Sequence, residues 1–293
     1  MSTQLRRWVL GVCVVVGLGG PEDVRAQADP QNFLFNAGQT IQPFYDGWAH
    51  NPDGSFEMHF GYLNRNYVEE VQVQIGGNNR MSPEGPDRGQ PNYFYPRVNR
   101  RVFSVTVPAD WGDRELVWQV TTHDESYRAV GWLQPEWEIS APGAGTASAE
   151  GPANQPPTLA VEAPSAIALG DVLTMMATVA DDGLPEPRQR GGGGRGTLPT
   201  FEPDSDGPTL PVNVPQVQTD RRKSPVRGRV DRVNVSWTQL RGPIGASVEV
   251  QDDAPDGVAA VTAMFESAGV YLFRVQASDG RLSASEDVSV TVR

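Results

Sequence analysis

The sequence has 293 residues, with 24 Lys and Arg against 36 Asp and Glu, and a formal net charge of −12. This length suits about two domains of roughly 150 residues each. Hydrophobic residues make up 38% and there is a single cysteine, which excludes a membrane bundle and a disulfide scaffold. The acidic balance argues against nucleic acid as a partner of the whole chain.

Residues 1–28 have the pattern of a secretory signal peptide. Arg6 and Arg7 precede an apolar run over residues 8–20, and Ala26-Gln27-Ala28 supplies an A-x-A cleavage motif. The run is too short for a helix that crosses about 30 Å of hydrocarbon. We therefore expect cleavage after Ala28, a secreted or periplasmic protein, and no membrane span after cleavage. The alternative is a retained N-terminal anchor.

Residues 29–140 are predicted to form an N-terminal β-sandwich. Apolar and polar residues alternate with period two in four segments, at residues 56–62, 67–75, 102–107 and 116–120. Asn51-Pro52-Asp53-Gly54 is a strong turn sequence after a further strand at 41–48. A long loop rich in Gly, Pro and Asn is expected over residues 76–91. Short strands at this spacing are typical of a two-sheet sandwich.

Residues 141–157 have the small, polar, proline-containing composition of a flexible linker. Residues 158–293 form a second strand-rich unit with the same alternation. The expected fold class is therefore all-β, with two immunoglobulin-like β-sandwich domains joined by the linker. Independent movement of the two sandwiches is the default for such a connection.

The second unit contains a series of short motifs. They begin at Asn154-Gln155-Pro156-Pro157 and continue through Val235-Ser236-Trp237-Thr238-Gln239 with Gly242-Pro243, residues 268–275 and Ala277-Ser278-Asp279-Gly280. With these motifs the unit resembles a PKD-type (polycystic-kidney-disease) immunoglobulin-like domain. The resemblance implies a seven-stranded sandwich that serves as a spacer or binding module on exported proteins, without catalytic residues. The first unit resembles no family that we can name.

Residues 183–231 interrupt this resemblance and are predicted to be a disordered insert. The segment contains Arg190 to Gly196 as Arg-Gly-Gly-Gly-Gly-Arg-Gly, several X-Pro pairs and one aromatic residue, Phe201. It is either a solvated loop or a polyanion-binding arm, and export argues against nucleic acid as its partner. We expect trypsin to cut first between Arg188 and Arg229.

Six carboxylates of the second unit are expected at one end of its sandwich, because the loops after alternate strands meet there. They are Asp181, Asp182, Asp252, Asp253, Asp256 and Asp279. Ca²⁺ takes six to eight oxygen ligands from such groups, so the sequence allows a calcium site. The alternative is that these residues make turns, in which Asp accepts from its own backbone and Gly supplies a positive φ.

The first unit is rich in aromatic residues, most of which must fill its core. Those expected in loops are Tyr93 and Tyr95, after the Gly/Pro loop, and Trp111, in a turn. These three are the candidates for a surface that stacks on sugar rings.

Histidines provide the alternative to a binding surface. His50 and His59 flank the Asn51–Gly54 turn and Asp46 is near in sequence, which suggests a hydrolase site in the first unit. No nucleophile-elbow, zinc-protease or phosphate-loop motif accompanies them. We therefore expect an exported, non-catalytic binding or spacer protein that contacts an extracellular or periplasmic protein or a glycan, and we keep the hydrolase as the alternative.

Overall fold

The structure is a computed structural model that describes residues 35–139, 154–184, 225–251 and 253–293. The predicted signal peptide, most of the predicted linker and most of the predicted insert lie outside these ranges. Within them, the chain is built from strands and a single turn of 3₁₀ helix, η1 (Pro135–Trp137). The predicted all-β class is confirmed.

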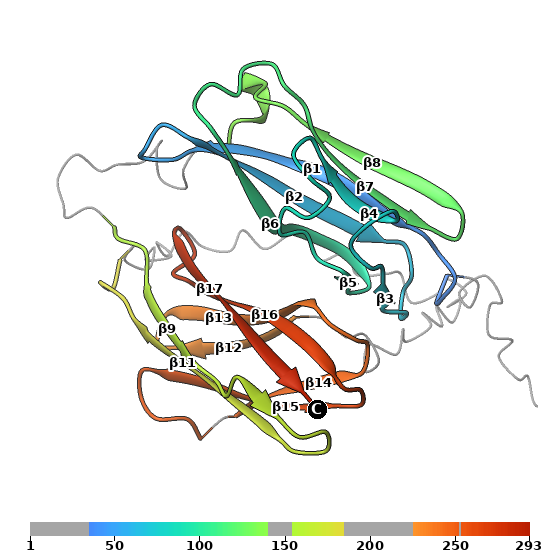
Figure 1. Ribbon diagram of the computed structural model, residues 1–293. Helices are drawn as coiled ribbons and strands as arrows, with labels where there is room; N and C mark the ends of the chain where they lie inside the picture. Colours follow the sequence, from blue (N-terminus) through green and yellow to red (C-terminus); the bar gives the residue numbers. More distant parts are fainter. Residues whose placement is uncertain (1–34, 140–153, 185–224, 252) are drawn as a thin grey trace, which may run out of the picture.

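The first half of the chain forms two three-stranded sheets and a short extra pair (Figure 1). One sheet has the order β1 (Ile41–His50), β2 (Phe56–Asn64), β6 (Arg97–Val107). The other has the order β4 (Asn79–Ser82), β7 (Leu116–Thr122), β8 (Glu125–Gly131). The pair joins β3 (Val71–Gln72) to β5 (Tyr93–Phe94).

Alternation along these strands produces the first hydrophobic core. Residues at every second position of β2, β6 and β7 point between the sheets, where the Phe60 ring stacks on Phe103 at 5.5 Å and the Trp118 ring meets Phe103 edge-on at 4.9 Å. The segments that alternate at 56–62, 102–107 and 116–120 are confirmed as strands. The expected loop at 76–91 is interrupted by β4, because Met81 turns its side chain into the core.

The second half is a β-sandwich with its own core. One sheet has the order β14 (Ala246–Gln251), β15 (Val258–Phe265), β11 (Leu173–Ala180), β9 (Thr158–Glu162). The facing sheet has the order β10 (Ala166–Ile167), β17 (Ser283–Val292), β16 (Gly269–Ser278), β13 (Val233–Arg241), β12 (Val226–Val230). With β9, β11, β13, β14, β15, β16 and β17 read as strands A to G, this is the arrangement of an immunoglobulin-type sandwich.

Strand β12 corrects the predicted insert. Residues 226–230 fall inside the segment expected to be disordered, but they pair in antiparallel fashion with β13 across the two-residue turn Asp231-Arg232. Val230 is buried and packs on the second core, which stabilises the strand. Residues 185–224 of the predicted insert lie outside the described residues.

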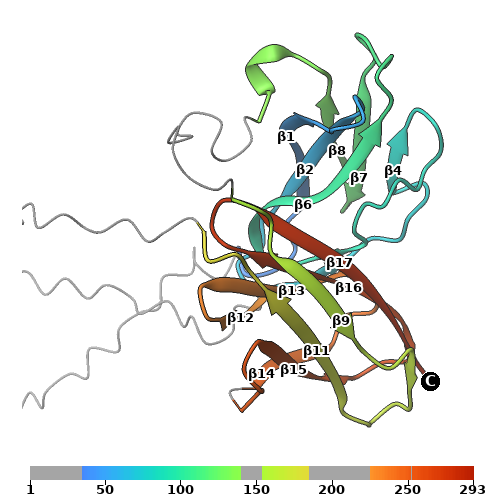
Figure 2. The ribbon, with the colours of Figure 1, turned by 90° about the vertical axis from the view of Figure 1, so that its left-hand side faces the viewer.

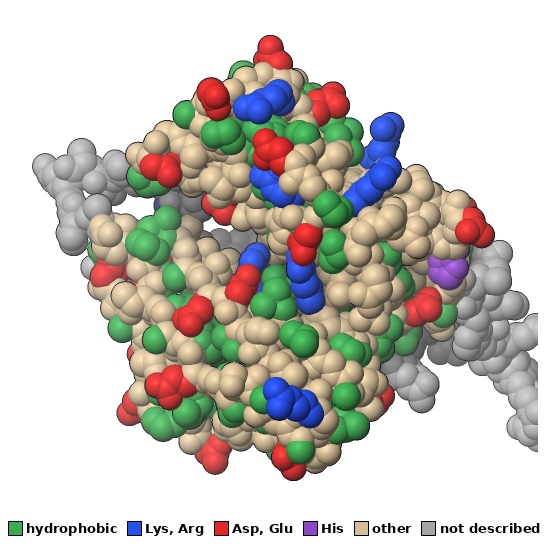
Figure 3. Space-filling view, in the orientation of Figure 1, with side chains coloured by type: hydrophobic (Ala, Val, Ile, Leu, Met, Phe, Trp, Pro, Cys, Tyr) green, Lys and Arg blue, Asp and Glu red, His purple; other side chains and the backbone are tan. Residues whose placement is uncertain are grey.

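The two halves are packed against each other, a contact that the composition of the linker leaves open. Figures 1 and 2 both show the first half resting on the five-stranded sheet of the second half, and β5 contacts β13. Acidic and basic side chains gather along the line between the halves (Figure 3). The contacts across this line include hydrogen bonds from Arg241 to Asp87 and from Gly242 to Asn92.

Candidate functional site

We call the contact region between the halves the seam. In the first half it comprises Gln72, residues 87–95 and Val102, and in the second half residues 239–242 and Arg274. The seam therefore joins the end of β13 to the loop and short strand that precede β6. Of the candidate site residues predicted from the sequence, the seam contains Tyr93 and Tyr95, and the sequence predicts no contact between these two segments.

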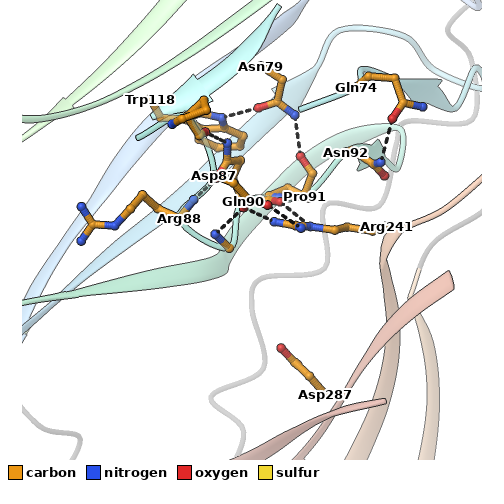
Figure 4. Close-up of polar contacts among 12 residues, drawn as sticks. Gln74, Asn79, Asp87, Arg88, Gln90, Pro91, Asn92, Trp118, Arg241 and Asp287 are labelled. Carbon is orange, nitrogen blue, oxygen red and sulfur yellow. Dashed lines mark hydrogen bonds and ion pairs between the residues drawn. The ribbon is translucent and has the colours of Figure 1, made fainter. Parts of the chain in front are cut away.

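Arg241, at the end of β13, makes the strongest polar contact of the seam (Figure 4). Its Nη1 and Nη2 donate to the two carboxylate oxygens of Asp87 at 3.0 and 2.6 Å, and its Nε donates to the Gln90 carbonyl at 3.0 Å. A planar guanidinium matches a carboxylate in this two-pronged geometry, which fixes orientation as well as distance. Arg241 thus holds one half in a set direction relative to the other.

The contact with Arg241 also changes the pKa of the Asp87 carboxylate. The Arg241 hydrogen bonds lower the pKa of Asp87 below its ordinary value, and the Gly89 N–H that Asp87 accepts acts in the same direction. Asp87 is therefore charged at neutral pH and remains so into mildly acidic solution.

Backbone groups add a second set of bonds across the seam. The Asn92 N–H donates to the Leu240 carbonyl at 3.0 Å, and the Gly242 N–H donates to the Asn92 side-chain oxygen at 3.0 Å. Gln72 Nε2 donates to the Gly242 carbonyl at 2.8 Å. The chain therefore uses main-chain groups that any sequence carries, which explains why residue type alone does not reveal this contact.

The loop that carries Asp87 and Asn92 is itself anchored in the first core. Asn79 is fully buried, accepts from the Trp118 indole N–H at 2.9 Å and donates to the Pro91 carbonyl at 2.8 Å (Figure 4). Gln90 is fully buried and donates to the Pro86 carbonyl at 2.6 Å. Two buried amide side chains thus fix this loop, and one of them, Asn79, is bonded to the core residue Trp118.

The predicted sugar-stacking residues are buried. Tyr93 and Trp111 are 1% exposed and Tyr95 is 7% exposed, so none of them offers a ring face to a ligand, and this prediction is wrong. The prediction assumed that residues in loops are exposed, but the segment around Tyr93 and Tyr95 is covered by the second half. The Tyr95 hydroxyl accepts from the Gln239 N–H at 3.0 Å and burial raises its pKa, so it is a neutral component of the seam.

Two other tryptophans are exposed, at the far end of β1. Trp132, just before η1, is 40% exposed, and Trp137, the last residue of η1, is 45% exposed. We call Trp132, Trp137, His50 and Glu138 the aromatic end. The Tyr45 hydroxyl donates to the Trp132 carbonyl at 3.2 Å, and the Tyr45 ring lies 5.6 Å from the Trp137 ring. One buried side chain thus contacts the backbone of Trp132 and the ring of Trp137.

Further contacts fix the aromatic end to β1. The Trp48 indole N–H donates to the Gln134 carbonyl at 2.8 Å, and the Ile139 N–H donates to the Trp48 carbonyl at 2.7 Å. His50 packs its ring 5.0 Å from Trp48 and lies 3.8 Å from the Glu138 carboxylate. His50, predicted as a catalytic candidate, therefore belongs to this surface.

The other two residues of the predicted hydrolase site lie elsewhere. Asp46 sits at a bulge in β1 beside His59 on β2, whereas His50 is paired with Phe56 at the end of the hairpin. Both carboxylate oxygens of Asp46 are occupied, one by Arg100 Nη1 at 2.9 Å and the other by the Arg101 N–H at 2.7 Å. Asp46 thus closes the bulge against β6, and the structure brings together only two of the three residues.

His59 nevertheless has polar neighbours on the outer face of this sheet. Its Nε2 lies 4.0 Å from Glu57, which also accepts a hydrogen bond from the Ser104 hydroxyl. Burial lowers the pKa of His59, with Arg101 acting in the same direction and Glu57 and Asp46 opposing. The ring is therefore neutral at pH 7.

The predicted calcium residues are gathered in part. Asp181 and Asp182 follow β11, and the Val179 N–H donates to the Gly257 carbonyl, which brings the Asp256 turn alongside. Asp279 accepts from Asn154 Nδ2 at 2.9 Å, and Asp182 accepts from the adjacent Gln155 N–H at 2.9 Å. Asp253 lies in the turn after β14, and Asp252 lies outside the described residues.

Three of these carboxylates, those of Asp181, Asp182 and Asp279, accept from backbone donors in their own turns. Asp279 Oδ1 accepts from the Arg281 and Leu282 N–H groups, and Asp181 Oδ2 accepts from the Gly183 N–H. Across the described residues, no group of three or more His, Cys, Asp or Glu side chains is arranged to hold a metal ion. Calcium stays a prediction of the sequence, and calorimetric titration with CaCl₂ tests it: heat of binding supports it and no heat removes it.

Comparisons with known proteins leave the chain without a family. No family model and no curated protein matches it. Among solved structures it is similar to domains 4 and 5 of the S-layer protein SbsC, with 13% identity over 61% of this chain and 65% of that one and a TM-score of 0.26. It is also similar to the D0–D1 domain of intimin, with 11% identity, 86% and 100% coverage and a TM-score of 0.23.

An endo-fucoidan hydrolase from glycoside hydrolase family 107 is a further neighbour, with 12% identity over 89% of this chain and 30% of that chain and a TM-score of 0.23. Likenesses with TM-scores this low carry no argument about function. The resemblance of the second half to PKD-type domains stays a prediction. In the part of the chain that is described, no helix has the length and apolar character needed to cross a membrane.

Proposed function

We propose that the protein is an exported binding or spacer protein that works by contact and not by catalysis. The observation that supports this best is the aromatic end, where two half-exposed tryptophans lie on a segment whose backbone is bonded to Tyr45 and Trp48. Exposed aromatic rings held rigidly lose little conformational entropy on binding, and they are enriched where proteins bind partners. The partner in this proposal is a protein or a glycan outside the cytoplasm.

The position of the aromatic end suits a presented contact surface. The short green coil at the top of Figure 1 is η1, at the end of the molecule away from the second half. Strand β1 runs ten residues from Ile41, near β3 and β5, to His50 at the aromatic end, a span of about 30 Å. In this proposal the second half is a base whose direction is set by the seam.

Binding assays with a double variant test the proposal. Glycan arrays and pull-downs from extracellular material should give a partner of the wild-type protein whose binding falls at least tenfold in Trp132→Ala/Trp137→Ala. The matched control is Tyr67→Ala, which removes a 38% exposed ring at the opposite end of the first half. Equal losses in both variants, or a hydrolytic turnover that His59→Ala abolishes in a folded protein, would contradict the proposal.

A further inference from the structure

The second half has a groove between the free edges of its two sheets. Strand β12 is the last strand of one sheet and β14 is the last strand of the other, and in Figure 2 both lie on the same side of the sandwich. The space between them has a volume of about 630 Å³ and is completed by the turn at residues 254–257. It is far from the aromatic end and shares no residue with the seam.

The register of β12 shows which of its backbone groups are free. Val230 pairs with Val233 across a two-residue turn, so Val230, Gly228 and Val226 exchange hydrogen bonds with β13. Arg227 and Arg229 occupy the alternate positions, and their N–H and C=O groups point away from β13. Strand β12 thus offers the backbone of two residues to a further strand, and none of the described strands pairs there.

The side chains of β12 divide between the groove and the outer face. Gly228 points inward, and a Cβ at this position would lie 3.4 Å from the Trp237 ring and 3.8 Å from Val250. Arg227 and Arg229 are exposed on the outer face, opposite the neutral Ser236 and Asn234 of β13. The Arg227 side chain has no hydrogen bond or ion pair to any described residue.

These charges argue against a second copy of the chain as the occupant. Residues 226–230 read Val-Arg-Gly-Arg-Val, which is the same in both directions. Antiparallel pairing of two copies about Gly228 would therefore place each arginine directly opposite another, and like charges in such cross-strand pairs are destabilising. Arginines on an edge strand also discourage indiscriminate pairing.

We propose that the β12 edge binds an extended acidic segment of another protein by strand addition. The added strand would pair with the free backbone of Arg227 and Arg229 and place its acidic side chains beside theirs on the outer face. Because side chains alternate along a strand, the residues between the acids would face Gly228 and Val250 in the groove and would be small and apolar. The ligand is thus an alternating acidic and apolar segment.

The test uses the full-length protein and two labelled peptides in fluorescence polarisation. One is a short capped peptide of alternating valine and glutamate, and the other has lysine in place of each glutamate. The glutamate peptide should bind with a Kd below about 1 mM, and the lysine peptide at least tenfold more weakly. Hydrogen exchange of the 226–230 amides should slow when the glutamate peptide is added.

Three variants separate charge from backbone pairing. Arg227→Glu should weaken binding of the glutamate peptide at least tenfold and strengthen binding of the lysine peptide. Arg227→Pro removes an outward N–H that the fold does not use, and it should abolish binding of both. The control is Arg128→Glu, at an exposed arginine on β8 of the first half, which should bind as the wild type does.

Several results would overturn the proposal. These are no binding of the glutamate peptide, equal binding of the two peptides, unchanged binding by Arg227→Pro, or slowed exchange only outside residues 226–230. Concentration-dependent dimerisation blocked by Arg227→Pro would also overturn it, in favour of a second copy as the occupant. The aromatic-end variant Trp132→Ala/Trp137→Ala should bind the glutamate peptide normally, so this test and that of the proposed function fail separately.

Discussion

Arg241 is the residue on which the relation between the two halves depends most. It donates three hydrogen bonds to the first half from the end of β13, two to Asp87 and one to the Gln90 carbonyl. Arg274 adds a second link, since its Nη1 donates to the Val102 carbonyl at 3.1 Å while Asp287 holds its other two nitrogens. Arg274 is pre-oriented by Asp287 within its own half, which reduces the entropy lost when the halves dock.

Removing the Arg241 side chain should therefore weaken the folded state. Arg241→Ala is expected to lower the free energy of unfolding by about 1–2 kcal/mol, because charge-assisted bonds are lost but Asp87 is half-exposed and recovers water. Arg241→Lys should recover less than half of the loss, since an ammonium cannot bind both oxygens in the same plane. Denaturant unfolding measures both, and an Arg241→Ala loss no larger than that of Arg128→Ala would contradict the expectation.

Asp87 makes this contribution depend on pH. Its pKa is lowered in the folded protein, so its stabilising effect is present above the unfolded value of about 3.9 and is lost as pH falls through the folded pKa. Unfolding free energies measured between pH 7 and pH 3 should fall more steeply in the wild type than in Asp87→Asn. Parallel pH profiles for the two proteins would show that the carboxylate does not act at the seam.

At the scale of elements, the alternation of apolar and polar residues predicts most of the strands. Strands β7, β11 and β16 bury every second side chain, and β2 and β6 do so over residues 58–62 and 103–107. Burial of Tyr93 and Tyr95 could not be predicted, because they are covered by β13 from more than a hundred residues away along the chain. Gln239 and Gly242 belong to the motifs that resemble a PKD-type domain, and both also form hydrogen bonds across the seam.

The candidate site was predictable to a smaller extent. Trp137 lies between Glu136 and Glu138, an alternation that is typical of a strand, but β8 ends at Gly131 and the chain turns through η1 instead. The exposure of the two rings follows from that turn. His50, Asp46 and His59 are close in sequence. In the hairpin, however, His50 pairs with Phe56 near the turn, whereas Asp46 lies beside His59 further along the strands.

Gly47 lets the segment after η1 lie against β1. Its φ is +119°, and a Cβ at this position would collide with the Trp137 carbonyl and lie 2.9 Å from Ile139. Gly47→Ala should therefore cost about 2–4 kcal/mol, as the combined effect of a strained backbone and overpacking. The near-ultraviolet circular dichroism of the tryptophans should change as the segment shifts.

Gly54 provides the matched control for this substitution. It also has a positive φ, of +86°, but no atom lies within 4 Å of the position of its Cβ. Gly54→Ala should cost only the backbone strain, about 1–2 kcal/mol, and leave the near-ultraviolet spectrum unchanged. Equal costs and equal spectra for the two variants would contradict the contact between Trp137 and β1.

At the scale of the whole molecule, two separate cores are joined by a polar seam. One core draws on residues 41–133 and the other on residues 159–292, and the bonds between the halves involve main-chain groups, amides and two arginines. Such a junction fixes the orientation of one half relative to the other, because each donor must meet its acceptor. A fixed direction allows the aromatic end and the β12 edge to be presented at a constant separation.

The rigidity of this arrangement is the central claim, and a distance measurement between spin labels tests it most directly. Labels at Arg128→Cys on β8 and Glu249→Cys on β14, in a Cys13→Ser background, report one position in each half. The account predicts a single narrow distance distribution that broadens in Arg241→Ala/Asp87→Ala. A broad distribution in the protein with an intact seam would contradict it.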